Sequence, residues 1–378
     1  MRRVVPFVLL TLLSAERTLA QGEDTSLPWR TSYFPYLTGG SNDGPLLNFR
    51  VRYAQAAEYE DRVTANAALN VEVGFASSGS RQGYVQFRAP QVWRGWRLDA
   101  RAGASREARF GYFGLGNDTE NNRDAVTEAQ PYLYRTRRTR YGGTIELTRL
   151  LRPPFMVALL GGIERDEYTS LPGPSTFATD FGDELKDTDI SGRLALLYDT
   201  RDNEFNPQKG VLLEAGAQVG SGGDSYTRLY TLLRGYLTIR EGTVAAARLG
   251  ASGMGGTPGL DARYRLPGWE REVTVLGGQD SHRSLDTGRL TGEHVLFGNF
   301  EVRHDVIAFG DLGAITLIGF LDAGRVFEGE GFRLTTEDLK VGGGGGIGLR
   351  ILRSSIFTFN FAGGPDGYNF SFGTGWIF

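Results

Sequence analysis

The sequence predicts an all-β protein, a transmembrane antiparallel β-barrel of about 16 strands, from three observations. The last eleven residues mostly alternate between aromatic and small or polar side chains, and the aromatic row includes Phe370, Phe372, Trp376 and Phe378. A strand with such a face in lipid needs its backbone paired on both sides, which a closed barrel provides. No stretch after residue 20 approaches the roughly 18 apolar residues of a membrane helix. The 54 glycines and the 12% share of aromatic residues suit close strand crossings and interfacial girdles.

The N-terminal end indicates export. Met1-Arg2-Arg3 is basic, Val4 to Leu13 is apolar apart from two positions, and Thr18-Leu19-Ala20 is a small-residue pattern, so residues 1–20 are predicted to be a cleaved secretory signal. Residues 21–30 are a short N-terminal segment, and residues 31–378 form the barrel. Because no change of composition marks a second domain, we expect one barrel in the outer membrane of a bacterial cell.

Alternation with a period of two recurs along the chain. In residues 225–240, Leu229 and Leu233 alternate with Arg228 and Arg234, so one face is apolar and the other is charged. Charges on one face indicate a polar lumen, into which we also expect Arg303 to point. The predicted strands are 32–38, 46–54, 63–76, 82–89, 96–107, 133–149, 155–168, 187–200, 211–220, 225–240, 243–254, 293–305, 313–327, 340–353, 355–363 and 367–378.

The lengths of the connections predict the topology, because turns on the periplasmic side of such barrels are short and loops on the outer side are long. The short connections are 90–95, 152–154, 203–210, 241–242 and 308–311. The long ones are 108–130, 169–186, 255–292 and 328–339. Short and long connections alternate, as an antiparallel barrel requires.

Composition excludes several classes of site. The chain has no cysteine, so it has neither disulfides nor thiolate metal ligands, and the net charge of −3 gives no reason to expect a nucleic-acid partner. The acidic residues between Asp180 and Asp189 lack the spacing of a calcium loop, so we expect a solvated loop, no metal and no cofactor. The glycine run 342–346 lacks the Lys-Ser/Thr of a phosphate loop and is expected to let another segment pack close.

One turn has a distinctive composition. Residues 198–210 run from the end of a strand into a tight periplasmic turn whose Asx and Pro chemistry reverses the chain. The residues that define this turn motif are Asp199, Arg201, Asp202, Asn203, Asn206, Pro207 and Gly210.

The longest loop and the strands after it contain three further motifs. The loop motif comprises Gly277, Gly278, Ser284, Leu285, Gly288 and Arg289, with Arg283 between its halves. An Asn-x-Glu-x-Arg strand with Glu301 at its centre follows, and then a Gly-x-x-Asp-x-Gly strand that contains Asp322. With the turn motif and the terminal aromatic strand, the order of these motifs resembles the BamA/TamA family, or bacterial surface antigen family, over essentially the whole mature chain.

The resemblance implies a specific arrangement of the long loop. In that family the loop folds into the lumen, and its arginine pairs with the strand acid, so Arg283 is expected to pair with Asp322 and with Glu301 as a second partner. The family has glycine and an aromatic residue after the arginine, whereas this chain has Ser284 and Leu285. The pair either fixes the loop as a purely structural contact or also gates the lumen.

The resemblance further implies an outer-membrane assembly or translocation barrel for a protein or lipid client. We expect no periplasmic POTRA repeats, because only the signal and a short segment precede the barrel, and therefore a separate periplasmic partner protein. The other expected partners are outer-membrane lipid, lipopolysaccharide and the machinery that inserts the chain, for which Phe370, Phe372, Trp376 and Phe378 are the predicted C-terminal signal. A passive pore is the alternative function.

A membrane-bound hydrolase is a remote alternative. The histidines are His282, His294 and His304, and His282 has Ser281 and Asp280 beside it. Three adjacent residues do not have the geometry of a catalytic triad, so we expect the protein not to be an enzyme.

Overall fold

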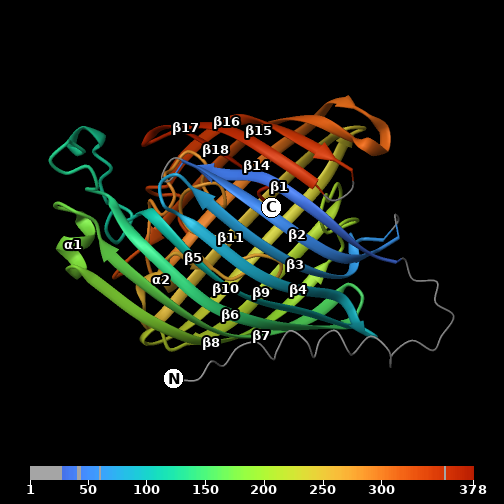
Figure 1. Cartoon of the computed structure of the whole chain (residues 1–378), viewed down its shortest axis with the longest axis horizontal. Helices are drawn as coiled ribbons and strands as arrows, with labels where there is room; N and C mark the ends of the chain where they lie inside the picture. Colours follow the sequence, from blue (N-terminus) through green and yellow to red (C-terminus); the bar gives the residue numbers. More distant parts are fainter. Residues whose placement is uncertain (1–27, 41–43, 59–60, 353–354) are drawn as a thin grey trace, which may run out of the picture.

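A computed structural model describes residues 28–378 apart from 41–43, 59–60 and 353–354; the predicted signal lies outside the described residues. Sixteen antiparallel strands close into one barrel, in which each long strand pairs with its neighbours in sequence order (Figure 1). The strands are β1 (Trp29–Gly40), β2 (Gly44–Ala56), β3 (Ala65–Ala76), β4 (Arg81–Trp93), β5 (Trp96–Gly111), β6 (Arg135–Arg152), β7 (Phe155–Ser170), β8 (Glu184–Asp199), β9 (Gly210–Gly220), β10 (Gly223–Arg240), β11 (Thr243–Pro258), β14 (His294–Ala308), β15 (Gly313–Phe327), β16 (Lys340–Ile351), β17 (Ser355–Gly364) and β18 (Gly367–Thr374). The predicted fold class is confirmed.

The alternation in the sequence separates the two faces of the wall. On β10, Leu229 and Leu237 are 71% and 64% exposed on the outer face, whereas Arg228 and Arg234 are buried on the lumenal face. Arg303 on β14 is likewise buried in the lumen. An apolar outer face meets lipid without losing hydrogen bonds, because every backbone group of a closed barrel is paired within the wall.

The long connections all lie at one end of the barrel. They span 112–134 with the 3₁₀ turn η2 (Arg123–Ala125), 171–183 with helix α1 (Thr176–Phe181), 259–293 and 328–339. The connections 94–95, 153–154, 241–242 and 309–312, the last containing η3 (Gly310–Leu312), lie at the other end. Figure 1 shows α1 at the opposite end from the start of β1. Among the described residues, no helix has the length and apolar character needed to cross a membrane.

Several strands differ in length from the prediction, and β1 and β4 are examples. β1 runs over 29–40, beyond the expected 32–38, because its pairing with β2 extends from Trp29 with Gln55 to Gly40 with Gly44. The turn expected at 90–95 consists only of Arg94 and Gly95, since β4 continues to Trp93. An irregularity in the register between Ala89 and Trp93 accommodates Pro90, which has no backbone donor.

The first and last strands of the barrel, β1 and β18, meet at a weakly paired seam. β1 and β18 are joined by one backbone partner pair, Gly39 with Phe372, whereas β17 and β18 pair from Phe357 with Thr374 to Gly364 with Gly367. Backbone hydrogen bonds hold neighbouring barrel strands together, so β1–β18 is the contact in the described wall with the shortest pairing.

The C-terminal residues do not continue the lipid-facing row. Tyr368 and Phe370 are 72% and 58% exposed, but β18 ends at Thr374, and Trp376 and Phe378 are each 8% exposed. Gly375, with φ of +82°, permits the bend into the lumen. The expectation that Trp376 and Phe378 face lipid is therefore wrong.

Polar contacts explain the bend of this C-terminal tail, residues 375–378. Trp376 Nε1 donates to Asn206 Oδ1 at 2.7 Å, and the carbonyl oxygen of Ile377 accepts from Arg271 at 2.7 Å. Arg303 donates to Phe378 O at 3.1 Å. These groups satisfy the polar end of the chain, which a lipid-facing strand would leave without partners. The role of the four aromatic residues as an insertion signal stays a prediction.

Candidate functional site

The connection between β11 and β14, residues 259–293, folds into the barrel and is called the lumen loop here. It contains helix α2 (Leu260–Arg263) and a small hairpin of β12 (Arg265–Leu266) and β13 (Val273–Thr274). Apolar residues of the loop and of the wall form one buried cluster, which includes Leu266, Leu276 and Leu285 of the loop with Leu232 and Phe297 of the wall. Apolar burial therefore holds the loop inside a lumen whose wall is otherwise rich in charge.

Arg283 of the lumen loop contacts the wall at three points. Its Nε and Nη2 donate to the two carboxylate oxygens of Asp322 on β15 at 2.9 and 2.8 Å, and its Nη1 donates to Glu301 on β14. The guanidinium also lies over the ring of Phe320, 3.5 Å from the ring centre. We call Arg283, Asp322 and Glu301 the loop anchor.

The loop anchor is buried and its charges are satisfied. Asn299 on β14 donates to Asp322 Oδ1 at 2.7 Å, and Arg303 donates to Glu301 Oε2 at 2.7 Å. Burial by itself lowers the pKa of Arg283, but hydrogen bonds to Asp322 and the charge of Glu301 outweigh burial and raise it. Arg283 therefore stays protonated, and removing either carboxylate would leave an uncompensated buried charge.

Ser284 and Leu285, where the chain departs from the family pattern, pack closely against the wall. A Cβ atom added at Gly342 on β16 would lie 2.0 Å from Ser284 Oγ, and one at Gly364 on β17 would lie 2.2 Å from it. Asn369 on β18 donates to the Leu285 carbonyl at 3.0 Å. The glycines thus leave the space into which the loop fits.

The remaining residues of the loop motif shape the loop and fix its outer part. Gly277 donates its N–H to Ser281 Oγ at 3.0 Å, and Gly278 donates to the Leu285 carbonyl at 2.9 Å. The glycines at 277, 278 and 288 all have positive φ. Arg289 Nε donates to Asp366, in the turn between β17 and β18, at 2.7 Å.

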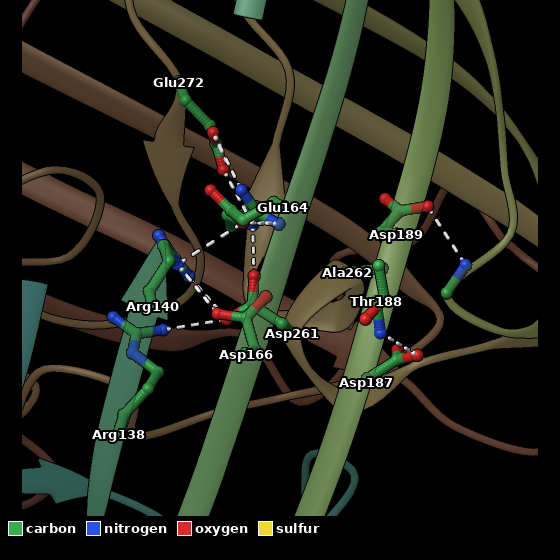
Figure 2. Close-up of polar contacts among 12 residues, drawn as sticks. Arg138, Arg140, Glu164, Asp166, Asp187, Thr188, Asp189, Asp261, Ala262 and Glu272 are labelled. Atoms are coloured by element: carbon green, nitrogen blue, oxygen red, sulfur yellow. Dashed lines mark hydrogen bonds and ion pairs between the residues drawn. The ribbon is translucent and has the colours of Figure 1, made fainter. Parts of the chain in front are cut away.

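A second anchor, which sequence reasoning missed, surrounds Asp261 of α2 (Figure 2). Asp261 Oδ1 accepts from Arg138 at 3.2 Å, from Arg140 at 2.5 Å and from Tyr168 Oη at 2.8 Å. Arg265 reaches from the loop to Glu164 on β7 at 2.5 Å. Burial alone raises the pKa of Asp261, but the neighbouring guanidinium groups lower it well below its usual range.

The carboxylates of Glu164, Asp166 and Asp261 lie within 4.8 Å of one another. Three carboxylates at this spacing are suitable metal ligands by type. Here Arg140 pairs with all three, Arg138 pairs with Asp261, and Arg265 pairs with Asp261 and Glu164, so three guanidinium groups balance the three carboxylates. Figure 2 also shows Asp189 on the neighbouring β8, and this residue accepts from the backbone N–H groups of Ser221 and Gly222 at 3.0 Å.

The periplasmic turn motif forms a third anchor with Glu270 of the lumen loop. Arg201 donates to Asp199 Oδ1 at 3.0 Å and to Glu270 Oε1 at 2.8 Å, and Arg234 donates to Glu270 Oε2 at 2.8 Å. Burial alone raises the pKa of Glu270, but the two arginines lower it to about 2. The motif is therefore joined to the loop, a contact that no pattern within either segment reveals.

Side chains of the same turn motif close the turn itself. Asp202 Oδ1 accepts from the N–H groups of Gln208 and Lys209, and Asn203 Oδ1 accepts from those of Phe205 and Asn206. Pro207 is buried between these contacts, and Gly210 has a φ of +103° at the start of β9. Asn206 connects the turn to Trp376 of the C-terminal tail.

The histidine considered for catalysis has other partners. His282 Nε2 lies 2.8 Å from the Lys340 carbonyl and Nδ1 lies 3.2 Å from Ser284 Oγ, while Ser281 Oγ contacts Gly277. Burial lowers the pKa of His282. These contacts do not connect Asp280, His282 and Ser281 as an acid, a base and a nucleophile.

Among the described residues, the lumen around the loop includes two sizeable cavities. The larger, of about 740 Å³, is lined mainly by residues of the outer half, and the smaller, of about 420 Å³, is lined by β1–β4 and the C-terminal tail. Glu270 and Arg271 of the lumen loop line both cavities. The loop thus lies against both cavities.

Comparisons with known proteins agree on one family. A model of the Omp85 superfamily domain matches residues 65–378. Among solved structures, BamA from Haemophilus ducreyi lacking POTRA domains 1–3 has 11% identity and a TM-score of 0.59, covering 91% of this chain and 70% of that one. The comparison with curated proteins gave no match.

Two structures of CdiB are also similar. CdiB from Acinetobacter baumannii has 12% identity and a TM-score of 0.52, covering 90% of this chain and 59% of that one. CdiB from Escherichia coli has 14% identity and a TM-score of 0.59, covering 92% and 63%. The chain thus spans less than two thirds of either CdiB chain, and at these identities the likeness shows the fold. Because the family model spans most of the chain and the barrel is closed, the protein belongs to the Omp85 superfamily of bacterial outer-membrane β-barrels, as the resemblance predicted.

Proposed function

We propose that the protein assembles a client into the outer membrane, or translocates it across that membrane, and that the lumen loop controls this step. The client is a protein or a lipid, delivered by a separate periplasmic partner. Membership of the Omp85 superfamily supports this class of function, and so does the similarity of the fold to BamA and CdiB. The observation that carries the proposal is the loop anchored inside the lumen.

Ionic contacts join the loop to the wall in addition to its buried apolar cluster, and they are the contacts that a charged client can replace. Asp261, Glu270 and Arg283 connect the loop to the wall and to the periplasmic turn. Release of the loop has to break these buried ion pairs and expose part of the apolar cluster, and a charged client can supply new partners for the ion pairs. In this mechanism, release of the loop anchor widens the lumen while the wall stays paired.

The seam between β1 and β18 offers a second route for the client. A single partner pair closes it in the described residues, so opening it disrupts fewer backbone contacts than opening any neighbouring pair of strands. An edge exposed in this way is a template for a further strand. A client strand would therefore leave the lumen sideways into lipid at this seam.

The alternative, a passive pore, is less well supported. A continuous pore requires an open lumen, whereas here the loop lies inside the lumen, beside cavities of about 740 and 420 Å³. The surface that binds the periplasmic partner is also part of the proposal. The periplasmic end presents the turn 200–209, in which Lys209 is exposed, and this surface is where we expect a partner to contact the barrel.

The test is depletion of the protein in its own bacterium, followed by quantification of outer-membrane proteins, surface lipids and secreted polypeptides. The proposal predicts that one of these classes is lost from its destination and accumulates in the periplasm. Wild-type protein should restore it, and the variant Arg283→Ala should restore it less well. If none of the three classes changes while uptake of small solutes falls, the protein is a pore and the proposal is wrong.

A further inference from the structure

Three arginines meet on the outer surface of the wall, near the end where the long loops lie. Arg81 is at the start of β4, Arg106 is near the end of β5, and Arg137 is near the start of β6. Arg81 and Arg106 are direct cross-strand partners, and Arg106 is paired with Thr139, two residues from Arg137. Direct partners have Cβ atoms about 5 Å apart and diagonal ones about 7–8 Å, so the three side chains share one patch.

The alternation of the strands places this patch on the lipid side. Arg81 is paired with Phe75, which is 62% exposed on the outer face. Glu107 and Arg138, the sequence neighbours of Arg106 and Arg137, point into the lumen, where Arg138 pairs with Asp261. Tyr141, four residues beyond Arg137 on β6, is 43% exposed. The patch therefore lies at the outer margin of the apolar band, where lipid headgroups begin.

No described carboxylate pairs with any of these three arginines. The Nε atoms of Arg106 and Arg137 are buried and have no hydrogen-bond acceptor among the described residues. Arg81 and Arg137 place two further positive charges close to the guanidinium group of Arg106. Like charges opposite each other destabilise a sheet, and a buried N–H without a partner costs further free energy.

Other cations on the same rim of the barrel are paired with carboxylates of the chain. Along β7 and β8, Arg165 donates to Glu167 at 3.1 Å, and Lys186 lies 2.7 Å from Glu184. Each cation there has a carboxylate two residues away in its own strand. The patch on β4–β6 lacks such carboxylates, so its compensating anion has to come from outside the chain.

We propose that Arg81, Arg106 and Arg137 bind the phosphate groups of an anionic lipid headgroup in the outer leaflet, the chemistry of a phosphorylated glycolipid such as lipopolysaccharide. A guanidinium offers parallel N–H donors that match phosphate oxygens, and the low dielectric of the headgroup margin strengthens the pairing. The acyl chains of the same lipid would lie along the apolar band beside Phe75. The site fixes one lipid at the β4–β6 side of the barrel, away from the β1–β18 seam.

The experiment uses the folded protein in neutral detergent, with lipid binding followed by native mass spectrometry. The ligands are lipid A with both phosphates, dephosphorylated lipid A and inorganic phosphate. The test variant is Arg106→Gln with Arg137→Gln, and the matched control is Arg165→Gln with Lys186→Gln, which removes two cations from the same rim. Because the Nε atoms of Arg106 and Arg137 are buried and these two side chains are only half-exposed, the exposed Arg81→Gln is a second test variant.

We expect the phosphorylated lipid to bind about tenfold more weakly to the double variant, and several-fold more weakly to Arg81→Gln, while the control variant binds like the wild type. Dephosphorylated lipid A should bind to the wild type as weakly as lipid A binds to the double variant. Equal binding of lipid A by the wild type and by Arg81→Gln would overturn the proposal. If inorganic phosphate binds as tightly as lipid A, the site is a free-anion site and the lipid assignment is wrong.

Discussion

Arg283 of the lumen loop and Asp322 of β15 share three hydrogen bonds, because the carboxylate accepts from the backbone N–H of Arg283 at 2.9 Å as well as from its Nε and Nη2. One carboxylate therefore fixes both the path of the loop and the orientation of its guanidinium group. A lysine at this position would keep the charge but lose the paired donors. The contact is accordingly specific for arginine.

Removal of this guanidinium group is the first prediction. Arg283→Ala leaves the buried Asp322 without a cation and Glu301 with Arg303 alone, so the free energy of unfolding in urea should fall by about 3–5 kcal/mol. Conductance in planar bilayers should rise, because the loop is released. Arg333→Ala, which removes an exposed arginine paired with Glu330, should change neither quantity. If both variants behave like the wild type, the loop anchor does not hold the loop.

The second prediction concerns the space beneath Ser284. Gly342→Ala would place a Cβ atom 2.0 Å from Ser284 Oγ, so the loop has to move away from β16. Gly319→Ala on β15 is the control, because no atom lies within 4 Å of its added Cβ. We expect faster proteolysis of the lumen loop only in Gly342→Ala. Equal rates for the two variants would show that the loop does not depend on this contact.

The C-terminal tail is tested by fluorescence. A variant that keeps only Trp376 of the five tryptophans should resist quenching by lipids with brominated acyl chains, because Trp376 is buried beside Asn206. The matched variant that keeps only Trp93, which is 63% exposed, should be quenched strongly. Strong quenching of both would mean that the tail lies in lipid.

The pH dependence of stability provides a fourth prediction. The pKa of Glu270 is about 2 in the folded protein, below its ordinary value of 4.5, so the charged carboxylate stabilises the fold fully above that ordinary value. This contribution is lost as pH falls from 4.5 toward about 2. Glu270→Gln should flatten the curve of unfolding free energy against pH in that window. An unchanged slope would show that Glu270 is not the group that titrates.

Local patterns in the sequence were sufficient to predict the wall of the barrel. Side chains of a strand alternate between two faces. The apolar row of Leu229, Leu233 and Leu237 therefore predicts a lipid-facing strand even when the neighbouring strands are not known. The lengths of the connections then place the lumen loop on the outer side. The contact of Arg283 with Asp322 and Glu301 was implied by the family resemblance, and the structure brings these three residues together.

Contacts between distant segments were decided only by the tertiary structure. Asp261 contacts Arg138 and Arg140, and Glu270 contacts Arg201. These partners lie far apart in the sequence, so the period of a strand pattern gives no information about the contacts. The end of β18 shows the same limit, because its aromatic alternation continues in sequence while the tail turns toward Arg303 and Asn206. A strand pattern reports which face is apolar, but whether that face meets lipid or lumen depends on partners that only the closed barrel places nearby. The sequence by itself determined the barrel and the connections that share each of its ends, and the closed fold determined how the loop and the tail fill it.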